Sequence, residues 1–284
     1  MEVYFGVGQG NGGDAMNLTS PSQVKAWCIE NGFHPNKVLG QNFLIDHNVL
    51  TSIVDAGLEK AGIENGELKI LEIGPGLGVL TEELLSRGCE VTAIEKDPVL
   101  AERLANQKLE KLEIIAGDAL EIIAKENFPA GGFAAMVSNL PYQAGTRILL
   151  DLCRARTIPV MTALVQTEVA ERLAAKEGSK TRGMAGVWAQ LDYDVEILRK
   201  VSANCFWPRP EIGSSVIRLT RHDRNLALTE EQRKTFRWLV KKGFEQRRKQ
   251  LGRIFRNQLE STARAEELSN EDWVMLAREL KVEG

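Results

Sequence analysis

The sequence lacks a long apolar segment, a leader and a cysteine framework. Its 284 residues contain no run of about 18 apolar residues that could span a bilayer. The first ten residues, MEVYFGVGQG, have neither the basic start nor the apolar stretch of a signal peptide. The four cysteines stand far apart, without a Cys-x-x-Cys pair, which argues against a disulfide scaffold or a zinc site. We therefore expect a protein of the reducing cytoplasm, with no membrane segment and no metal.

Net charge is small but strongly divided along the chain. The formal net charge is -3. Between Arg218 and Arg264, however, 14 basic and 5 acidic residues give +9, so the rest of the chain carries -12. A basic block on an acidic protein favours a polyanionic partner such as nucleic acid. The alternative is that these basic residues form a solvated helix face, whose positive charge is neutralised by neighbouring acidic residues.

The apolar pattern divides the chain into three parts. Residues 1–16 are rich in glycine and have no apolar period, which predicts a disordered tail and makes Met16 a candidate start. Residues 17–221 alternate short apolar runs with helical stretches, as in a doubly wound, mostly parallel α/β sheet. Residues 222–284 predict a small all-helical domain. Strands are expected at 68–73, 90–95, 112–117, 133–139, 159–165, 193–200 and 214–220, and helices at 77–87, 97–108, 118–125, 145–155, 229–243, 246–258 and 270–281.

A glycine-rich turn follows the first of these strands. Gly74, Gly76 and Gly78 allow a tight turn and a close approach of a ligand to the backbone. Their spacing differs from the dinucleotide pattern Gly-x-Gly-x-x-Gly, because Val79 stands where the third glycine would be. A bulky residue there disfavours a pyrophosphate at the helix start, and with it an NAD-dependent oxidoreductase.

Acidic residues follow the next two strands. Glu95 stands 21 residues after Gly74, where an acid accepts hydrogen bonds from ribose hydroxyls. Asp118 is placed to accept from an adenine amino group. Open α/β sheets bind ligands at the carboxyl ends of their strands, so the turn and both acids together predict a nucleoside cofactor, S-adenosylmethionine rather than NAD. Taken singly, either acid could simply cap a helix.

The sequence NLPY follows the fourth strand. Pro141 favours an extended Leu140, whose carbonyl can then point outward beside the amide oxygen of Asn139. Two neutral acceptors and the flat ring of Tyr142 suit an amine on an aromatic ring, such as N6 of adenine. They would free its lone pair for attack on a methyl sulfonium. The alternative is a purely structural turn at the end of the strand, in which the Asn139 side chain forms a cap and the Tyr142 ring packs against the protein.

A stiff aromatic segment occupies positions 206–213. Pro208 and Pro210 favour an extended backbone that could hold Phe206 or Trp207 against a base. Stacking on an aromatic ring contributes about 1–3 kcal/mol per base. The alternative is a rigid loop whose aromatic residues belong to the core.

Five motifs occur in the order of one family. They are QNFL (41–44), EIGPGLGVLT (72–81), GDA (117–119), NLPY (139–142) and FWPRPEIGSSV (206–216). On these motifs the sequence closely resembles the ribosomal RNA adenine N6,N6-dimethyltransferases, in particular the bacterial 16S enzymes, from about Leu18 to Leu251. The resemblance implies a Rossmann-like S-adenosylmethionine-dependent methyltransferase fold with a C-terminal helical domain. It also implies dimethylation of two adjacent adenosines in a hairpin loop near the 3′ end of 16S RNA, within the small subunit or its precursor.

The same resemblance implies roles for individual residues. Cofactor contacts are expected at Gln41, Asn42, Leu44, Gly74, Gly76, Glu95, Asp118, Ala119 and Asn139. Asn139, Leu140 and Tyr142 would form the amine pocket, and Phe206 would stack on the other face of the target adenine. The segment FEQRRKQL (244–251) resembles a basic helix of the family and implies RNA contacts by Arg247, Arg248, Lys249 and Arg253. No metal is expected, because the sulfonium already activates the methyl group, and a monomer is the default.

The sequence also departs from the family pattern. SKTRGMAG (179–186) lacks the usual Tyr-Gly-Arg-Leu-Ser run, Arg147 stands where proline is usual, and residues 1–16 have no counterpart. Two other functions remain open. One is the 23S dimethyltransferase activity that confers macrolide resistance. The other is a non-catalytic ribosome-assembly factor, against which the intact Asn139, Glu95 and Asp118 argue.

Overall fold

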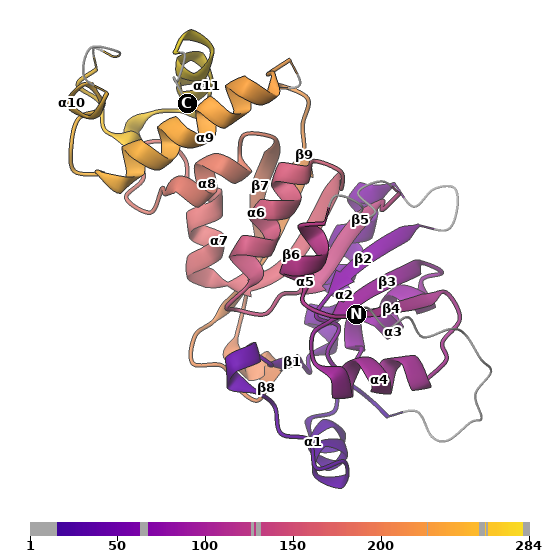
Figure 1. Ribbon diagram of the computed structural model, residues 1–284. Helices are drawn as coiled ribbons and strands as arrows, with labels where there is room; N and C mark the ends of the chain where they lie inside the picture. The colour runs from indigo at the N-terminus through magenta and orange to yellow at the C-terminus, as the bar shows by residue number, and fades with distance from the viewer. Residues whose placement is uncertain are drawn as a thin grey trace.

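Most of the chain forms one sheet with helices on both sides (Figure 1). The computed structural model describes residues 16–62, 68–125, 128, 132–225, 227–255, 259 and 261–280; apart from Met16, the predicted tail lies outside them. The main sheet has the strand order β4-β3-β2-β5-β6-β9-β7, and β1 and β8 form a separate pair. The strands are β1 (Phe43–Leu44), β2 (Lys69–Ile73), β3 (Glu90–Glu95), β4 (Leu112–Ala116), β5 (Ala135–Asn139), β6 (Val160–Gln166), β7 (Tyr193–Val201), β8 (Phe206–Trp207) and β9 (Ser214–Arg221).

The helices fill the connections between the strands and the C-terminal part of the chain. They are α1 (Pro21–Glu30), α2 (His47–Ala61), α3 (Val79–Ser86), α4 (Pro98–Asn106), α5 (Ala119–Ile123), α6 (Gly145–Ala155), α7 (Thr167–Ala174), α8 (Met184–Ala189), α9 (Glu230–Glu245), α10 (Leu251–Ile254) and α11 (Asn270–Glu279). Short 3-10 turns cover Lys37–Leu39, Ala203–Cys205 and Ala265–Glu267. Among the residues described, no helix is long and apolar enough to cross a membrane.

The sheet is parallel except at β9. Strands β4, β3, β2, β5 and β6 pair in parallel, and β9 runs antiparallel to both β6 and β7. The predicted α/β class with a mostly parallel sheet is therefore confirmed. Because the parallel strands run the same way, their carboxyl ends meet along one edge.

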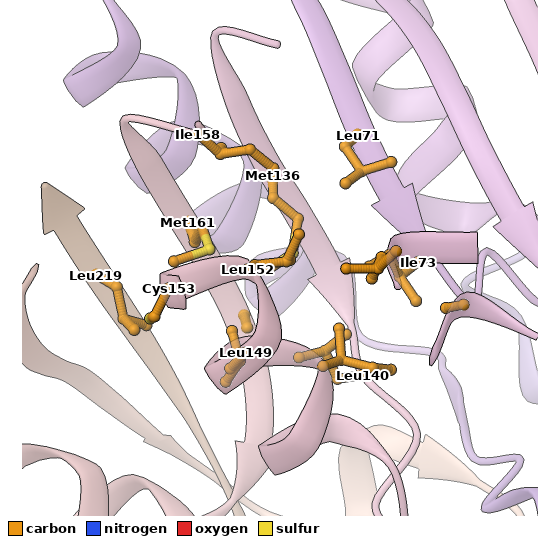
Figure 2. Close-up of a cluster of buried hydrophobic side chains, with 14 of the residues drawn as sticks. Leu71, Ile73, Met136, Leu140, Leu149, Leu152, Cys153, Ile158, Met161 and Leu219 are labelled. Atoms are coloured by element: carbon orange, nitrogen blue, oxygen red, sulfur yellow. The ribbon is translucent and has the colours of Figure 1, made fainter. Parts of the chain in front are cut away.

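Two apolar cores lie on opposite faces of this sheet. Successive strand residues point to opposite faces, so Ile70 packs in the core beside α2 while Leu71 packs in the core beside α6. Figure 2 shows the second core, where Leu149 and Leu152 of α6 lie near Met136 of β5. Strands covered on both faces have near-continuous apolar runs, as the sequence pattern predicts.

A third core lies among the C-terminal helices. Phe236, Leu239 and Trp273 of α9 and α11 are fully buried there. Val187 of α8 joins them, although it precedes the domain boundary that the sequence predicts at residue 221. The C-terminal helices therefore build their core partly on a helix of the preceding segment.

The predicted helix at 246–258 is wrong. Helix α9 ends at Glu245, residues 246–250 form a turn, and α10 covers only Leu251–Ile254. The six residues from Glu245 to Gln250 are all polar, so a helix there would have no apolar face to bury. Residues 256–258 lie outside the described part. The sequence pattern also gave no prediction for α1, α2, α7, α8 or the β1–β8 pair.

The buried ion pair between Arg233 and Asp192 joins α9 to the segment before β7. Nη1 of Arg233 donates to both carboxylate oxygens of Asp192, at 3.0 and 2.7 Å, and both side chains are buried. We expect Asp192→Ala to lower the free energy of unfolding by about 3–5 kcal/mol, because it leaves a buried guanidinium without its counter-ion. Urea denaturation measures the change.

Asp194→Ala provides the matched control, because the pair between Asp194 and Arg224 is half exposed on both sides. Its loss should cost less than about 1 kcal/mol. Equal losses in the two variants would contradict the assignment of the Asp192 pair as the tie between these segments.

Candidate active site

A cavity opens at the carboxyl edge of the sheet, where β2, β3, β4 and β5 end. The turns at 74–77, 95–96, 117–120 and 139–144 form its walls. Residues 38–44, which we call the strap, line it from the N-terminal side. It therefore brings together all the predicted cofactor residues, Gln41, Asn42, Leu44, Gly74, Gly76, Glu95, Asp118, Ala119 and Asn139, with Leu140 and Tyr142.

The glycine turn connects β2 to α3. Gly74, Gly76 and Gly78 have φ angles of 69°, 60° and 94°, in the left-handed region that favours glycine. The N–H of Gly76 donates to Oε2 of Glu95 at 3.0 Å. A Cβ on Gly76 would lie 3.2 Å from the ring of Phe43 in the strap. The absence of side chains thus lets the strap, the turn and the end of β3 approach one another.

Glu95 is a buried carboxylate fixed by backbone donors. Besides Gly76, the N–H of Asp97 donates to it, to Oε1 at 2.8 Å. Burial raises the pKa of Glu95, and these two backbone hydrogen bonds oppose that rise. The cap of α4 is Asp97, whose carboxylate accepts from Val99 and Leu100, so Glu95 is not the helix cap of this segment.

Glu72 is a second buried carboxylate at the cavity, and the sequence analysis did not select it. Its side chain is 1 % exposed and accepts a hydrogen bond of 2.7 Å from the hydroxyl of Thr81. Burial raises the pKa of Glu72 to about 8, and the nearby charge of Glu95 adds to the rise. Within the described residues, neither carboxylate forms an ion pair with a basic side chain. An acid in the otherwise apolar stretch ILEI (70–73) is the signal that could have identified it.

Asp118 lines the cavity and also forms structural contacts with its neighbours. Oδ1 accepts from the N–H of Leu120 at 2.9 Å and so caps α5, and Oδ2 pairs with Lys96 at 2.8 Å. The hydrogen bond from Lys96 lowers the pKa of Asp118. Ala119, the first residue of α5, is buried beside it. Asp118 is thus a helix cap, and its ionised oxygens also lie at the cavity wall.

The amide of Asn139 is oriented by the strap. Its Nδ2 donates to the backbone oxygen of Asn42 at 3.0 Å, and no donor among the described residues bonds to the amide oxygen. The N–H of Leu140 continues the sheet by donating to Leu164 at 3.1 Å, while its side chain is buried in the core beside α6. The side chain of Leu140 is therefore part of the core, and the role predicted for its carbonyl stays a prediction.

Tyr142 is held by a residue from the far end of the sheet. Its hydroxyl and that of Ser214, at the start of β9, share a hydrogen bond of 2.6 Å. Ser214 is fully buried, and burial raises the pKa of the Tyr142 phenol, which is therefore neutral near pH 7. The sequence motif that contains Ser214 gave no hint of this contact, because 72 residues separate it from Tyr142.

The strap is fastened to the site at several points. Nε2 of Gln41 donates to Asp97 at 2.8 Å, and Nδ2 of Asn42 donates to the oxygen of Gly40 at 3.1 Å. Gly40 has a φ of 68°, and a Cβ there would lie 3.1 Å from the backbone nitrogen of Tyr142. The strap thus passes close to the NLPY turn.

Phe206 is located differently from its prediction. It pairs with Leu44 in the β1–β8 ladder, is 2 % exposed and packs in the core beside α2. It does not line the cavity. Trp207 stacks on Phe43 with ring centroids 6.5 Å apart. This arrangement matches the alternative of a rigid loop with core aromatics, because the ladder turns Phe206 inward.

The predicted RNA-contact residues lie among the C-terminal helices, away from the cavity lining. Arg247 is tied down: Nη2 donates to the backbone oxygen of Lys180, and Nε lies 3.5 Å from Glu266. Arg248 and Lys249 are exposed in the same turn, and Arg253 is exposed on α10. The described residues hold no group of three or more His, Cys, Asp or Glu side chains that could hold a metal ion.

The sequence matches known proteins over most of its length. The profile of the ribosomal RNA adenine dimethylase family matches residues 32–281. Ribosomal RNA small subunit methyltransferase A of Deinococcus radiodurans is 44 % identical over 210 residues, 72 % of this chain and 68 % of the relative. The protein with the same name from Mycobacterium tuberculosis is 35 % identical over 288 residues, 93 % of this chain and 88 % of the relative.

Solved structures share the fold. A dimethyladenosine transferase from Plasmodium falciparum has a TM-score of 0.68 at 21 % identity, covering 82 % of this chain and 95 % of its own. The 23S rRNA methyltransferase ErmE has a TM-score of 0.62 at 26 % identity, covering 84 % of this chain and 99 % of its own.

The raised pKa of Glu72 predicts a pH-dependent stability. Between its ordinary pKa of 4.5 and the folded value of about 8, the folded protein holds a proton that the unfolded chain has lost. Stability must therefore fall as pH rises through this range, by at most about 1.4 kcal/mol per pH unit. We expect Glu72→Gln to remove this pH dependence. As pH rises toward 8, the free energy of unfolding of the wild type should therefore fall relative to that of Glu72→Gln.

Urea titrations at several pH values measure the difference. Glu59→Gln, on the exposed face of α2, is the control for loss of one acidic group. A difference between Glu72→Gln and the wild type that does not change with pH would mean that Glu72 is ionised in the folded protein.

Proposed function

Because the chain belongs to the ribosomal RNA adenine dimethylase family, we propose that it dimethylates N6 of two adjacent adenosines in a hairpin loop near the 3′ end of 16S ribosomal RNA, with S-adenosylmethionine as methyl donor. The observation that carries the proposal is the amide of Asn139. The backbone oxygen of Asn42 holds its nitrogen, and Asn139 and Leu140 both line the cavity. The small-subunit names of the relatives support 16S RNA as the substrate.

The cavity has the chemistry that this cofactor requires. Glu95 is positioned to accept from ribose hydroxyls and Asp118 from the adenine amino group, as in other sheets that bind nucleosides at this edge. Glu72 and Glu95 are buried acids without a basic partner among the described residues, so they suit a ligand with positive charge. Bound S-adenosylmethionine supplies a methyl group already activated by a cationic sulfur.

Asn139 and Leu140 act on the target amine. Two neutral oxygen acceptors draw the two N6 hydrogens out of the ring plane and so expose the nitrogen lone pair. Tyr142 provides a flat face for the base, and Ser214 fixes its ring as a positioning residue. Phe206 has no part in this arrangement while β8 is paired with β1.

RNA is bound by the basic C-terminal segment as well as by the cavity. Arg248, Lys249 and Arg253 are exposed and can contact phosphates, whereas Arg247 holds the turn in place through Lys180 and Glu266. We place the reaction in the cytoplasm, on the small subunit or its precursor, with the enzyme as a monomer. The likeness to ErmE favours one second candidate, methylation of 23S RNA.

A methyl-transfer assay tests the proposal directly. The protein is mixed with labelled S-adenosylmethionine and small subunits that lack the modification, with large subunits in parallel, and the nucleosides are identified by mass spectrometry. Dimethyladenosine in small-subunit RNA alone is the expected result. Label in large-subunit RNA would favour the 23S activity, and no label with retained subunit binding would indicate an assembly factor.

Asn139→Ala tests the role of the amide. We expect kcat to fall about 100-fold or more, comparable to the loss of one oriented polar group that acts on a transition state. RNA affinity should change little, because phosphate contacts supply most of it. Asn204→Ala, at an exposed asparagine, is the control. Turnover near the wild-type level in Asn139→Ala would refute the role.

Ser214→Ala tests the positioning of Tyr142. Losing one hydrogen bond of about 1 kcal/mol should raise the RNA KM about fivefold and leave cofactor affinity unchanged. Ser214→Thr keeps the hydroxyl and should restore KM. Ser215→Ala is the matched control, because the hydroxyl of Ser215 bonds to Thr167 instead. If Ser214→Ala and Ser215→Ala behave alike, the effect is general destabilisation and not the position of Tyr142.

A further inference from the structure

A second cavity lies between α6, α8 and α9, outside the active site. Arg147 and Arg154 of α6 line one side, Arg233 and Arg237 of α9 line the other, and Trp188 of α8 completes the wall. In Figure 1, α6 leads from the carboxyl edge of the sheet toward α8 and α9. The cavity therefore lies where the methyltransferase fold meets the C-terminal helices.

The arginines of this cavity exceed the acids that can neutralise them. Arg147 pairs with Asp151 at 2.8 Å, and Arg233 pairs with Asp192. A third acid of the lining, Glu230, is engaged by Arg156 outside the cavity, at 3.0 Å. Within the described chain, Arg154 and Arg237 are left without an ion-pair partner. Two positive charges thus remain uncompensated around one hollow.

The pKa of Arg237 is lowered, in part by this excess of positive charge. Its guanidinium is half-buried, and burial lowers its pKa first, with repulsion from Arg154 the next cause. Arg233 and Arg156 add to the repulsion, and Glu230 alone opposes it. Like charges held close together are destabilising unless an anion lies between them.

Hydrogen-bond donors in the lining also lack acceptors. Among the described residues, Nε of Arg233, on a side chain 2 % exposed, has no hydrogen-bond partner, and neither has Nε1 of Trp188. Both residues line the cavity. Buried donors without partners are costly, and an oxyanion in the hollow would satisfy them.

We propose that this cavity binds a phosphate group of the RNA substrate, with Arg154 and Arg237 as its charged contacts. The inference rests on the proposed function. Arginine suits the role because its planar fork donates two hydrogen bonds to a phosphate. Arg147 lies at the mouth, with its side chain 71 % exposed, and can meet the adjoining backbone.

The position of the cavity suits RNA that is already held in the active site. Ala144 and Ile148, at the start of α6, line the active-site cavity, and Arg154 lies near the other end of the same helix. The nine steps from Gly145 to Arg154 rise about 14 Å along the helix axis, a distance that a few successive nucleotides of an RNA strand can span. A stem next to the target loop would thus extend along α6 to the cavity.

Arg154→Gln, Arg237→Gln and the double variant test the proposal in the full-length protein. The probe is the small subunit that lacks the modification, and its Kd is measured over a range of salt concentrations. We expect the double variant to raise Kd about tenfold and to reduce the salt slope by about two, one for each lost phosphate contact. Arg87→Gln with Arg278→Gln removes the same charge elsewhere and should leave the slope nearer to that of the wild type. Affinity for S-adenosylmethionine and the thermal midpoint serve as checks of folding.

Adding inorganic phosphate distinguishes an RNA phosphate from a small free anion as the ligand of this cavity. Inorganic phosphate should raise the thermal midpoint of the wild type and not that of the double variant. Protection by phosphate with an unchanged RNA slope would make the cavity a site for a small free anion and would overturn the proposal. No effect in either experiment would mean that water fills it, with the same consequence.

The two proposals fail in different ways. If the wild type transfers no methyl group to small-subunit RNA, the proposed function is wrong, whatever phosphate does at this cavity. If the wild type methylates normally and the double variant binds the subunit equally well, only the phosphate site is refuted.

Discussion

The site depends on the parallel alignment of β4, β3, β2 and β5. The ladder continues past the strand ends, where the N–H of Gly74 donates to Ile94 at 2.9 Å and that of Gly117 donates to Glu95 at 2.8 Å. These bonds fix three successive turns at one edge, so residues far apart in sequence meet there. A slip of one residue between two strands would turn their side chains to the opposite faces and disperse the site. The rigidity of the sheet is thus the source of the cavity's geometry.

Charge is divided between the two ends of the molecule in a way that matches two different ligands. Glu72 and Glu95 are buried at the cofactor cavity, where burial raises the pKa of both, and a cationic sulfur or ammonium bound beside them would favour their ionised forms. The segment from Arg218 to Arg264 carries +9, a charge that would attract a polyanion. The small net charge of -3 therefore conceals two opposite fields. Helix α6 connects them, because it begins at the first cavity and ends at the second.

The sequence predicted those parts of the fold that local patterns encode. The strands at 68–73 and 90–95 are predominantly apolar, and the glycine turn has a spacing that a tight left-handed turn requires. The contacts that complete the site are not local. Ser214 meets Tyr142 across 72 residues, and the carbonyl of Asn42 meets Asn139 across 97. The location of Phe206 was not predictable for the same reason, since its pairing with Leu44 decides which way it points, and its stacking on the target adenine stays a prediction.

Dimethylation places a constraint on the two acceptors that these contacts hold. An unmethylated amine has a hydrogen for the Asn139 oxygen and one for the Leu140 carbonyl, whereas a monomethylated amine has only one. A site that needed both hydrogen bonds would stop after the first methyl group. The acceptors come from adjacent residues, and the strap fixes only the nitrogen of the Asn139 amide. In the proposed reaction, either oxygen can therefore take the remaining hydrogen after the first methyl group has been transferred.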